Sequence, residues 1–77
     1  MKWQDRISVD PKVCHGKACF KGRRVMVSVV LANLAEGDTP QAISANYHLT
    51  LEDIQAAILF AADMAEDRFL PLGQETN

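Results

Sequence analysis

Apolar residues follow two different periods along the chain, and the period of two comes first. Ile7 and Val9 alternate with polar neighbours, which is the pattern of a short strand. Further on, Gly16 and Gly22 flank a short apolar piece and indicate turns. This part of the sequence predicts a β arm or small hairpin over residues 1–27.

Helical spacing begins directly after this arm. Val30, Leu31 and Leu34 share one side of a helix about two turns long. Ser28 is a candidate N-cap for this helix, and Gly37 has the position of the residue that follows a helix C-terminus. The pattern predicts that this first helix is short.

A second short helix is indicated by its own start signal. Thr39 can cap the N-terminus through its hydroxyl, and Pro40 fits the first helical position. Ala42, Ile43 and Tyr47 then form one apolar side of the helix.

The third helix has the best-specified start. Thr50 and Asp53 have the spacing of a capping box, and Leu49 and Ile54 lie where a hydrophobic staple closes. Pro71 marks the end of the helix. At roughly 100° per residue, the predicted core face consists of Ile54, Ala57, Ile58, Ala61, Ala65 and Phe69.

Leu59 and Phe60 lie outside this core face, and two interpretations of them stay open. Either the helix is covered on two sides by its own small fold, or these residues form a surface for a second chain. A chain of 77 residues builds only a small core. We therefore expect the protein to be a homodimer.

Together these elements predict a mainly α fold, a three-helix helix-turn-helix-like domain preceded by a short β arm or hairpin. The chain is too short for a second domain. We expect a single domain over residues 1–77, with the basic β arm at 1–27, the helical body at 28–70 and a flexible tail at 71–77.

Charge is distributed unevenly along the chain. Residues 1–24 hold seven Lys/Arg and two Asp, and residues 25–77 hold one Arg and eight acids, so +5 and −7 add to the net −2. Four cations fall within eight residues, at Lys17, Lys21, Arg23 and Arg24. Such a cluster can contact DNA phosphates. It is equally well explained as a solvated loop, or as a patch that neutralises acidic helices of this chain or of a second copy.

In a literal helix-turn-helix, the start of the third helix would face DNA, and it carries Leu51, Glu52, Asp53 and Gln55. Two carboxylates would be repelled by phosphates there, whereas the helix dipole alone explains acids in a first turn. We therefore place any DNA contact on the basic arm or on the combined surface of a dimer.

Residues of metal-ligand type are Cys14, His15, Cys19 and His48, but they lack the paired spacing of structural zinc sites. Cys14 and His15 are adjacent, so their side chains point apart in an extended segment, and no third group orients them for nucleophilic catalysis. The sequence predicts no metal, no cofactor and no enzymatic activity.

The first residues lack the apolar stretch of a secretory signal, and the apolar runs are too short to span a membrane. We expect a cytoplasmic protein that does not associate with membranes. In such a reducing compartment, the two cysteines are expected to be free thiols.

Three motifs occur in order along the chain. They are ISVDPKVCHGKACFKGRRV at residues 7–25, LAEGDTP at 34–40 and YHLTLEDIQAAI at 47–58. Their order and spacing resemble the bacterial domain-of-unknown-function 433 family, over about residues 6–72. The resemblance implies a small helix-turn-helix-like domain of the VapB antitoxin type, whose partner is a PIN-like ribonuclease toxin.

On this resemblance we expect an antitoxin-like regulatory protein that binds and neutralises such a toxin, with promoter DNA as a second candidate partner of the dimer. An Arg or Lys is a natural plug for the acidic, metal-dependent site of a nuclease. The candidate plugs are Lys21, Arg23, Arg24 and Arg68. The candidate DNA contacts are Lys17, Lys21, Arg23 and Arg24, and the candidate partner contacts are Leu59, Phe60, Arg68, Phe69 and Leu70. Two alternatives stay open: a helix-turn-helix DNA-binding regulator without a toxin, and a non-catalytic dimerisation or adaptor module.

Overall fold

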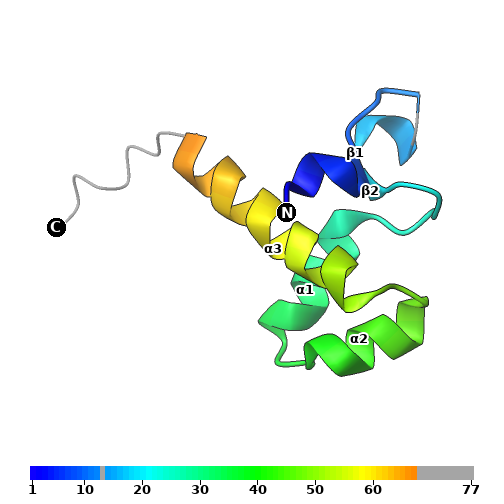
Figure 1. The fold of residues 1–77 in the computed structure, drawn as a ribbon, viewed down its shortest axis with the longest axis vertical. Coiled ribbons are helices and arrows are strands. Elements are labelled where there is room, and N and C mark those ends of the chain that lie inside the picture. Colours follow the sequence, from blue (N-terminus) through cyan, green and yellow to red (C-terminus); the bar gives the residue numbers. More distant parts are fainter. Residues whose placement is uncertain (13, 68–77) are drawn as a thin grey trace, which may run out of the picture.

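The computed structural model describes residues 1–12 and 14–67, and it consists of a short β pair followed by three α-helices (Figure 1). In chain order the elements are η1 (Trp3–Asp5), β1 (Ile7–Ser8), η2 (Cys14–Gly16), β2 (Cys19–Phe20), α1 (Val27–Ala35), α2 (Pro40–Tyr47) and α3 (Leu51–Asp67). This order confirms the predicted mainly α fold with a β hairpin before the helices. Arg68, Phe69, Leu70 and the predicted tail at 71–77 lie outside the described residues.

The two strands are antiparallel and connect the N-terminal segment to the core. Ile7 pairs with Phe20, and both side chains are buried. The amide of Lys21 also donates to the Arg6 carbonyl over 2.9 Å, which extends the pairing by one step. Because a two-stranded hairpin is only marginally stable alone, burial of Ile7 and Phe20 against the helices is what holds it.

Cys19 lies in β2, fully buried. Cys19 is disulfide-bonded, so the prediction of a free thiol is wrong at this position. The prediction rested on the expected reducing compartment. The sequence alone does not show whether the fold brings sulfur atoms within bonding distance.

The first helix, α1, begins at Val27, two residues before the start that a Ser28 cap predicts, and without that cap. Its N-cap residue is Met26, which makes no side-chain capping bond, so the prediction of Ser28 as N-cap is wrong. The Val27 amide donates instead to the Ala18 carbonyl over 3.0 Å, so a long-range backbone contact satisfies this end of the helix. At the other end, Gly37 has φ +100° and donates its N–H to the Leu34 carbonyl, as its predicted position after the C-terminus requires.

The second helix, α2, starts as its sequence predicts. Thr39 is the N-cap, its Oγ1 accepts the Ala42 N–H over 3.1 Å, and Pro40 occupies the first helical position. The side-chain amide of Asn33 donates through Nδ2 to the Tyr47 hydroxyl over 3.0 Å, which joins α2 to α1.

The core lies where α3 packs against α1 and α2 on one side and against η1 on another. Ile54 and Ala57 are buried as predicted, but Ile58 is 41% exposed and Ala65 is exposed, so the predicted core face is wrong at these two positions. The buried sector of α3 is rotated toward Ala56, which is fully buried. The cause is η1, because a segment distant in sequence covers a side of α3 that helical periodicity alone does not single out. The buried apolar residues are Ile7, Phe20, Val27, Val30, Ile43, Leu49, Ile54, Ala56 and Ala57, together with Cys19.

Within residues 1–12 and 14–67, no helix has the length and apolar content needed to cross a membrane.

Candidate functional site

A polar cleft of about 410 Å³ lies where the N-terminal segment meets the start of α3. Arg6 precedes β1, Lys21 and Arg23 follow β2, and Thr50 and Asp53 belong to the start of α3. Pairing of β1 with β2 brings Arg6 beside the Lys21 segment, and core packing then places both against α3. We call this site the cationic cleft; Met1 and Asp5 complete its lining.

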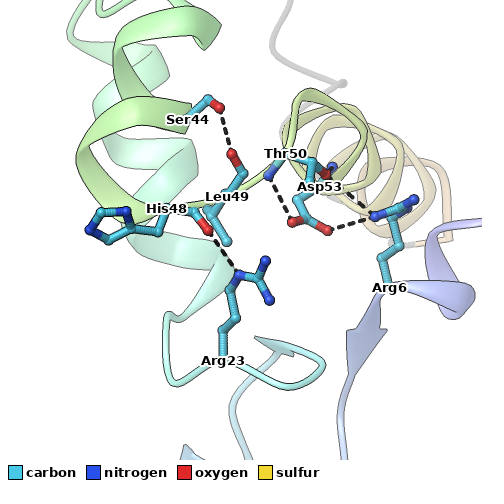
Figure 2. Close-up of polar contacts among 7 residues, drawn as sticks. All are labelled: Arg6, Arg23, Ser44, His48, Leu49, Thr50 and Asp53. Atoms are coloured by element: carbon cyan, nitrogen blue, oxygen red, sulfur yellow. Dashed lines mark hydrogen bonds and ion pairs between the residues drawn. The ribbon is translucent and has the colours of Figure 1, made fainter.

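Asp53 anchors one wall of the cationic cleft (Figure 2). The Thr50 N–H donates to its Oδ2, and its own N–H donates to Thr50 Oγ1, both over 3.0 Å. This reciprocal pair is the predicted capping box. Leu49 and Ile54, predicted to form the hydrophobic staple, are both buried in the core.

Arg6 completes the polar contacts of Asp53, with Nη1 3.1 Å from Oδ1. The Asp53 residue is only 6% exposed. Burial raises the pKa of Asp53, but the Thr50 N–H, the Arg6 side chain and the Thr50 hydroxyl together outweigh this effect, so the pKa lies below its ordinary value. The carboxylate is therefore a structural charge whose polar contacts are already made within the chain.

Arg23 is held at the opposite wall by the turn between α2 and α3. Its Nε–H donates to the His48 carbonyl over 2.9 Å (Figure 2). His48 is the C-cap of α2 and adopts a left-handed conformation, φ +57°. The Ser44 hydroxyl donates to the next carbonyl, that of Leu49. The turn is thus fixed by one side chain from α2 and one from the loop after β2, and the Arg23 guanidinium has a defined position beside it.

Gly22 explains how Lys21 and Arg23 come to the same cleft. The Arg23 N–H donates to the Phe20 carbonyl over 3.1 Å, closing a tight turn in which Gly22 has φ +74°. A positive φ at the third position of such a turn favours glycine. The turn therefore presents Lys21 and Arg23 at one edge of the molecule.

The four cations predicted to contact DNA do not all line the same cleft. Lys21 and Arg23 line the cationic cleft, whereas Lys17 lies at an apolar cleft of about 420 Å³. Arg24 is exposed. The apolar cleft is lined, besides Lys17, by Ala18, Val27, Ser28, Leu31 and Phe60.

Arg6 is the residue of the cationic cleft that sequence reasoning missed. It is 47 residues away from Asp53 in the chain, and no local motif connects the two. The available signal was indirect: an Arg directly before the strand residue Ile7 has to leave the core, and a capping-box carboxylate can accept a further hydrogen bond.

Phe60 and Leu59, predicted to contact a partner, are both half-buried. The Phe60 ring meets the Trp3 ring edge-on, with centroids 4.9 Å apart. Trp3 Nε1 in turn donates to Asp63 Oδ2 over 2.6 Å. The chain therefore covers part of Phe60 itself, and the remainder of the side chain borders the apolar cleft.

Among the described residues, no group of three or more His, Cys, Asp or Glu side chains is close enough together to hold a metal ion. His48 serves as the C-cap of α2, and His15 lies in η2 with φ +57°. The two histidines thus belong to separate turns.

A family model described as "Protein of unknown function (DUF433)" matches residues 7–61. The chain belongs to the DUF433 family. The DUF433 match runs from β1 into α3 and includes Lys21, Arg23, Thr50 and Asp53, while Arg6 lies one residue before it.

Among solved structures, the X-ray crystal structure of Rv2018 from Mycobacterium tuberculosis is similar to this DUF433 protein. The two share 31% sequence identity at a TM-score of 0.64, and the match covers 74% of this chain. This chain spans only 27% of the length of Rv2018. No curated protein matches the sequence significantly.

Proposed function

We propose that this DUF433 protein is a non-catalytic, antitoxin-like regulator that binds and neutralises a PIN-like ribonuclease toxin. The observation that carries the proposal is the pair Lys21 and Arg23, presented on a tight turn at the rim of the cationic cleft. The catalytic site of a metal-dependent nuclease is acidic, and a positioned cation is the simplest group that blocks it.

The position of Arg23 supports this role. Its Nε is engaged by the His48 carbonyl, which orients the planar guanidinium before any partner arrives. An oriented guanidinium loses less conformational freedom on binding a carboxylate than a free one, and it can form two parallel hydrogen bonds. Lys21, two residues away, adds a second charge on the same turn.

Co-expression with the product of the neighbouring reading frame tests the proposal. The unaltered chain should relieve toxicity and co-purify with the nuclease. The double variant Lys21→Ala/Arg23→Ala should lose both properties while keeping its circular dichroism spectrum. The matched control, Lys2→Ala/Lys12→Ala, removes two charges from exposed positions outside the cationic cleft and should behave as the unaltered chain. Equal protection by both double variants would contradict the proposal.

Promoter DNA is the second candidate partner, because Lys21 and Arg23 lie beside the turn between α2 and α3, where a helix-turn-helix protein approaches DNA. Deep insertion of the start of α3 into a DNA groove is disfavoured, because the exposed Glu52 carboxylate there would be repelled by the phosphates. A mobility shift with the upstream DNA, weakening as salt rises and abolished in Lys21→Ala/Arg23→Ala, would favour a DNA-binding regulator. A dimer inert in both assays would favour an adaptor module.

A further inference from the structure

The outer face of α3 carries an apolar stripe that the chain leaves uncovered. Its residues follow a spacing of four, three, four and three, as the core positions of a coiled coil do. The two large members, Leu51 and Ile58, are 49% and 41% exposed. The stripe consists of Leu51, Gln55, Ile58, Ala62 and Ala65, all of them exposed, and we call it the outer face of α3.

This stripe is separate from the surface that α3 uses for its own fold. Ala56 and Ala57 are buried against the other elements, and at roughly 100° per residue they lie on the far side of the helix from the stripe, while the buried Ile54 lies at the border between the two surfaces. The C-terminal half of α3 also extends beyond α1 and α2 (Figure 1). The outer face is therefore accessible along several turns.

Charge restricts what can cover the outer face. Along one edge of it, Glu52, Leu59 and Glu66 are spaced by seven residues, and α3 contains no Lys or Arg between residues 51 and 67. Both glutamates are exposed. The other acids of α3 whose side chains the structure describes are engaged within the chain, Asp53 by Arg6 and Asp63 by Trp3.

A second copy of the chain is a poor match for this edge. Antiparallel pairing about Ile58 would bring Leu51 opposite Ala65, which fits in size, but it would also bring Glu52 to within two residues of the level of Glu66, on the same edge, at both ends. Like charges facing each other across a helix pair are destabilising. A helix with Lys or Arg at the matching positions gains at both ends instead.

We propose that the outer face of α3 is the docking site for a basic amphipathic helix of a partner protein. Leu51 and Ile58 pack against the apolar side of the partner helix, and the small side chains of Ala62 and Ala65 leave room for larger residues from that helix. Glu52 and Glu66 pair with cations on its flank. The inference rests on the proposed function for the existence of a protein partner, and it gives that partner a surface distinct from the cationic cleft.

The probe is a synthetic peptide of three heptads with Leu at the a and d positions and Lys at e and g, added to the full chain. Amide shifts in NMR spectra should follow Leu51, Gln55, Ile58, Ala62 and Ala65. Anisotropy of the labelled peptide should show that a version with Glu in place of Lys binds about tenfold more weakly or worse. No binding of the Lys peptide, or shifts confined to the apolar cleft at Leu31 and Phe60, would overturn the proposal.

Two pairs of variants separate the outer face from general surface effects. Ile58→Asp should weaken peptide binding by about tenfold or more, whereas Val29→Asp, on a 37% exposed residue of α1, should not change it. Glu52→Lys/Glu66→Lys should reverse the preference between the two peptides, and Glu36→Lys/Asp38→Lys, which changes two exposed acids outside α3, should leave it unchanged. Equal effects within either pair contradict the proposal.

The oligomeric state and the toxin complex provide the remaining readouts. A dimer that Ile58→Asp converts to a monomer would assign the outer face to a second copy and overturn the proposal. A toxin complex that tolerates Ile58→Asp but not Lys21→Ala/Arg23→Ala would leave the proposed function standing and remove this inference. If no toxin complex forms but the peptide results hold, the outer face remains a docking site and the proposed function fails.

Discussion

The cationic cleft and the outer face of α3 share one helix and differ in how their charges are held. In the cationic cleft, Arg6 and Arg23 are both tied to other parts of the chain, one to a carboxylate and one to a carbonyl. On the outer face, Glu52 and Glu66 are exposed beside apolar residues. A net charge of −2 therefore describes neither surface, and the two surfaces can serve partners of opposite sign.

The largest contrast expected is between a residue that joins the N-terminal segment to the core and one on the outer face. Phe20→Ala removes a side chain that is 2% exposed, and it should lower the free energy of unfolding by about 3–5 kcal/mol. Ile58→Ala, on a side chain that is 41% exposed, should change it by less than about 0.5 kcal/mol. Urea unfolding followed by circular dichroism measures both.

Phe20→Leu provides a milder version of the first variant if the alanine protein does not fold, with an expected loss of about 1.5 kcal/mol or less. If Ile58→Ala were as damaging as Phe20→Ala, the outer face would be packed in the isolated chain, and the contrast between the two regions would disappear.

The next largest effect concerns the two acids in the first turn of α3. Asp53→Ala removes half of the capping box and leaves Arg6 without its carboxylate, so it should cost about 2 kcal/mol. Glu52→Ala, one residue earlier and exposed, should cost no more than about 0.5 kcal/mol. Thermal unfolding at neutral pH separates them, and equal shifts in Tm would show that the helix dipole and not the capping box dominates.

Acid should remove the contribution of Asp53 gradually. Since the pKa of Asp53 is lower in the folded chain than in the unfolded one, its stabilisation is fully present above the unfolded value of about 3.9 and is lost as the pH falls through the lowered folded value. The difference in the free energy of unfolding between the unaltered chain and Asp53→Asn should therefore become smaller as the pH falls from 5 toward about 2. A difference that stays constant over this range would contradict the assigned contacts.

The smallest effect expected distinguishes two neighbouring arginines. Arg23→Lys loses the Nε–H that donates to the His48 carbonyl and should cost about 0.5–1.5 kcal/mol. Arg24→Lys, at the adjacent exposed position, should be neutral within error. Urea unfolding with tightly determined midpoints is the measurement, and a neutral Arg23→Lys would mean that the turn holds its shape without the arginine.

Local signals predicted the helices and their caps well, because capping is decided within four residues. Thr39, Gly37 and the Thr50–Asp53 pair all act as their sequence positions indicate. Ser28 failed as a cap because the carbonyl of Ala18, nine residues before the helix begins, satisfies the start of α1 instead.

The surfaces were harder to predict, because they depend on contacts between distant segments. Periodicity places Ile58 in the core, because it does not reveal that η1 covers another side of α3. Arg6 was overlooked for the same reason, since it meets Asp53 only after β1 has paired with β2. The charge cluster at residues 17–24 was visible in sequence, but its division between two clefts was not.

Trp3 is an intrinsic fluorescence probe. It is the sole tryptophan of the sequence, so tryptophan fluorescence reports on one place, the junction between η1 and α3. Its indole meets the Phe60 ring and donates to Asp63, and both partners lie on α3, within a few residues of Ile58. Rearrangement of this helix during docking or unfolding should therefore change the wavelength of the emission maximum and the fluorescence intensity of the unlabelled protein.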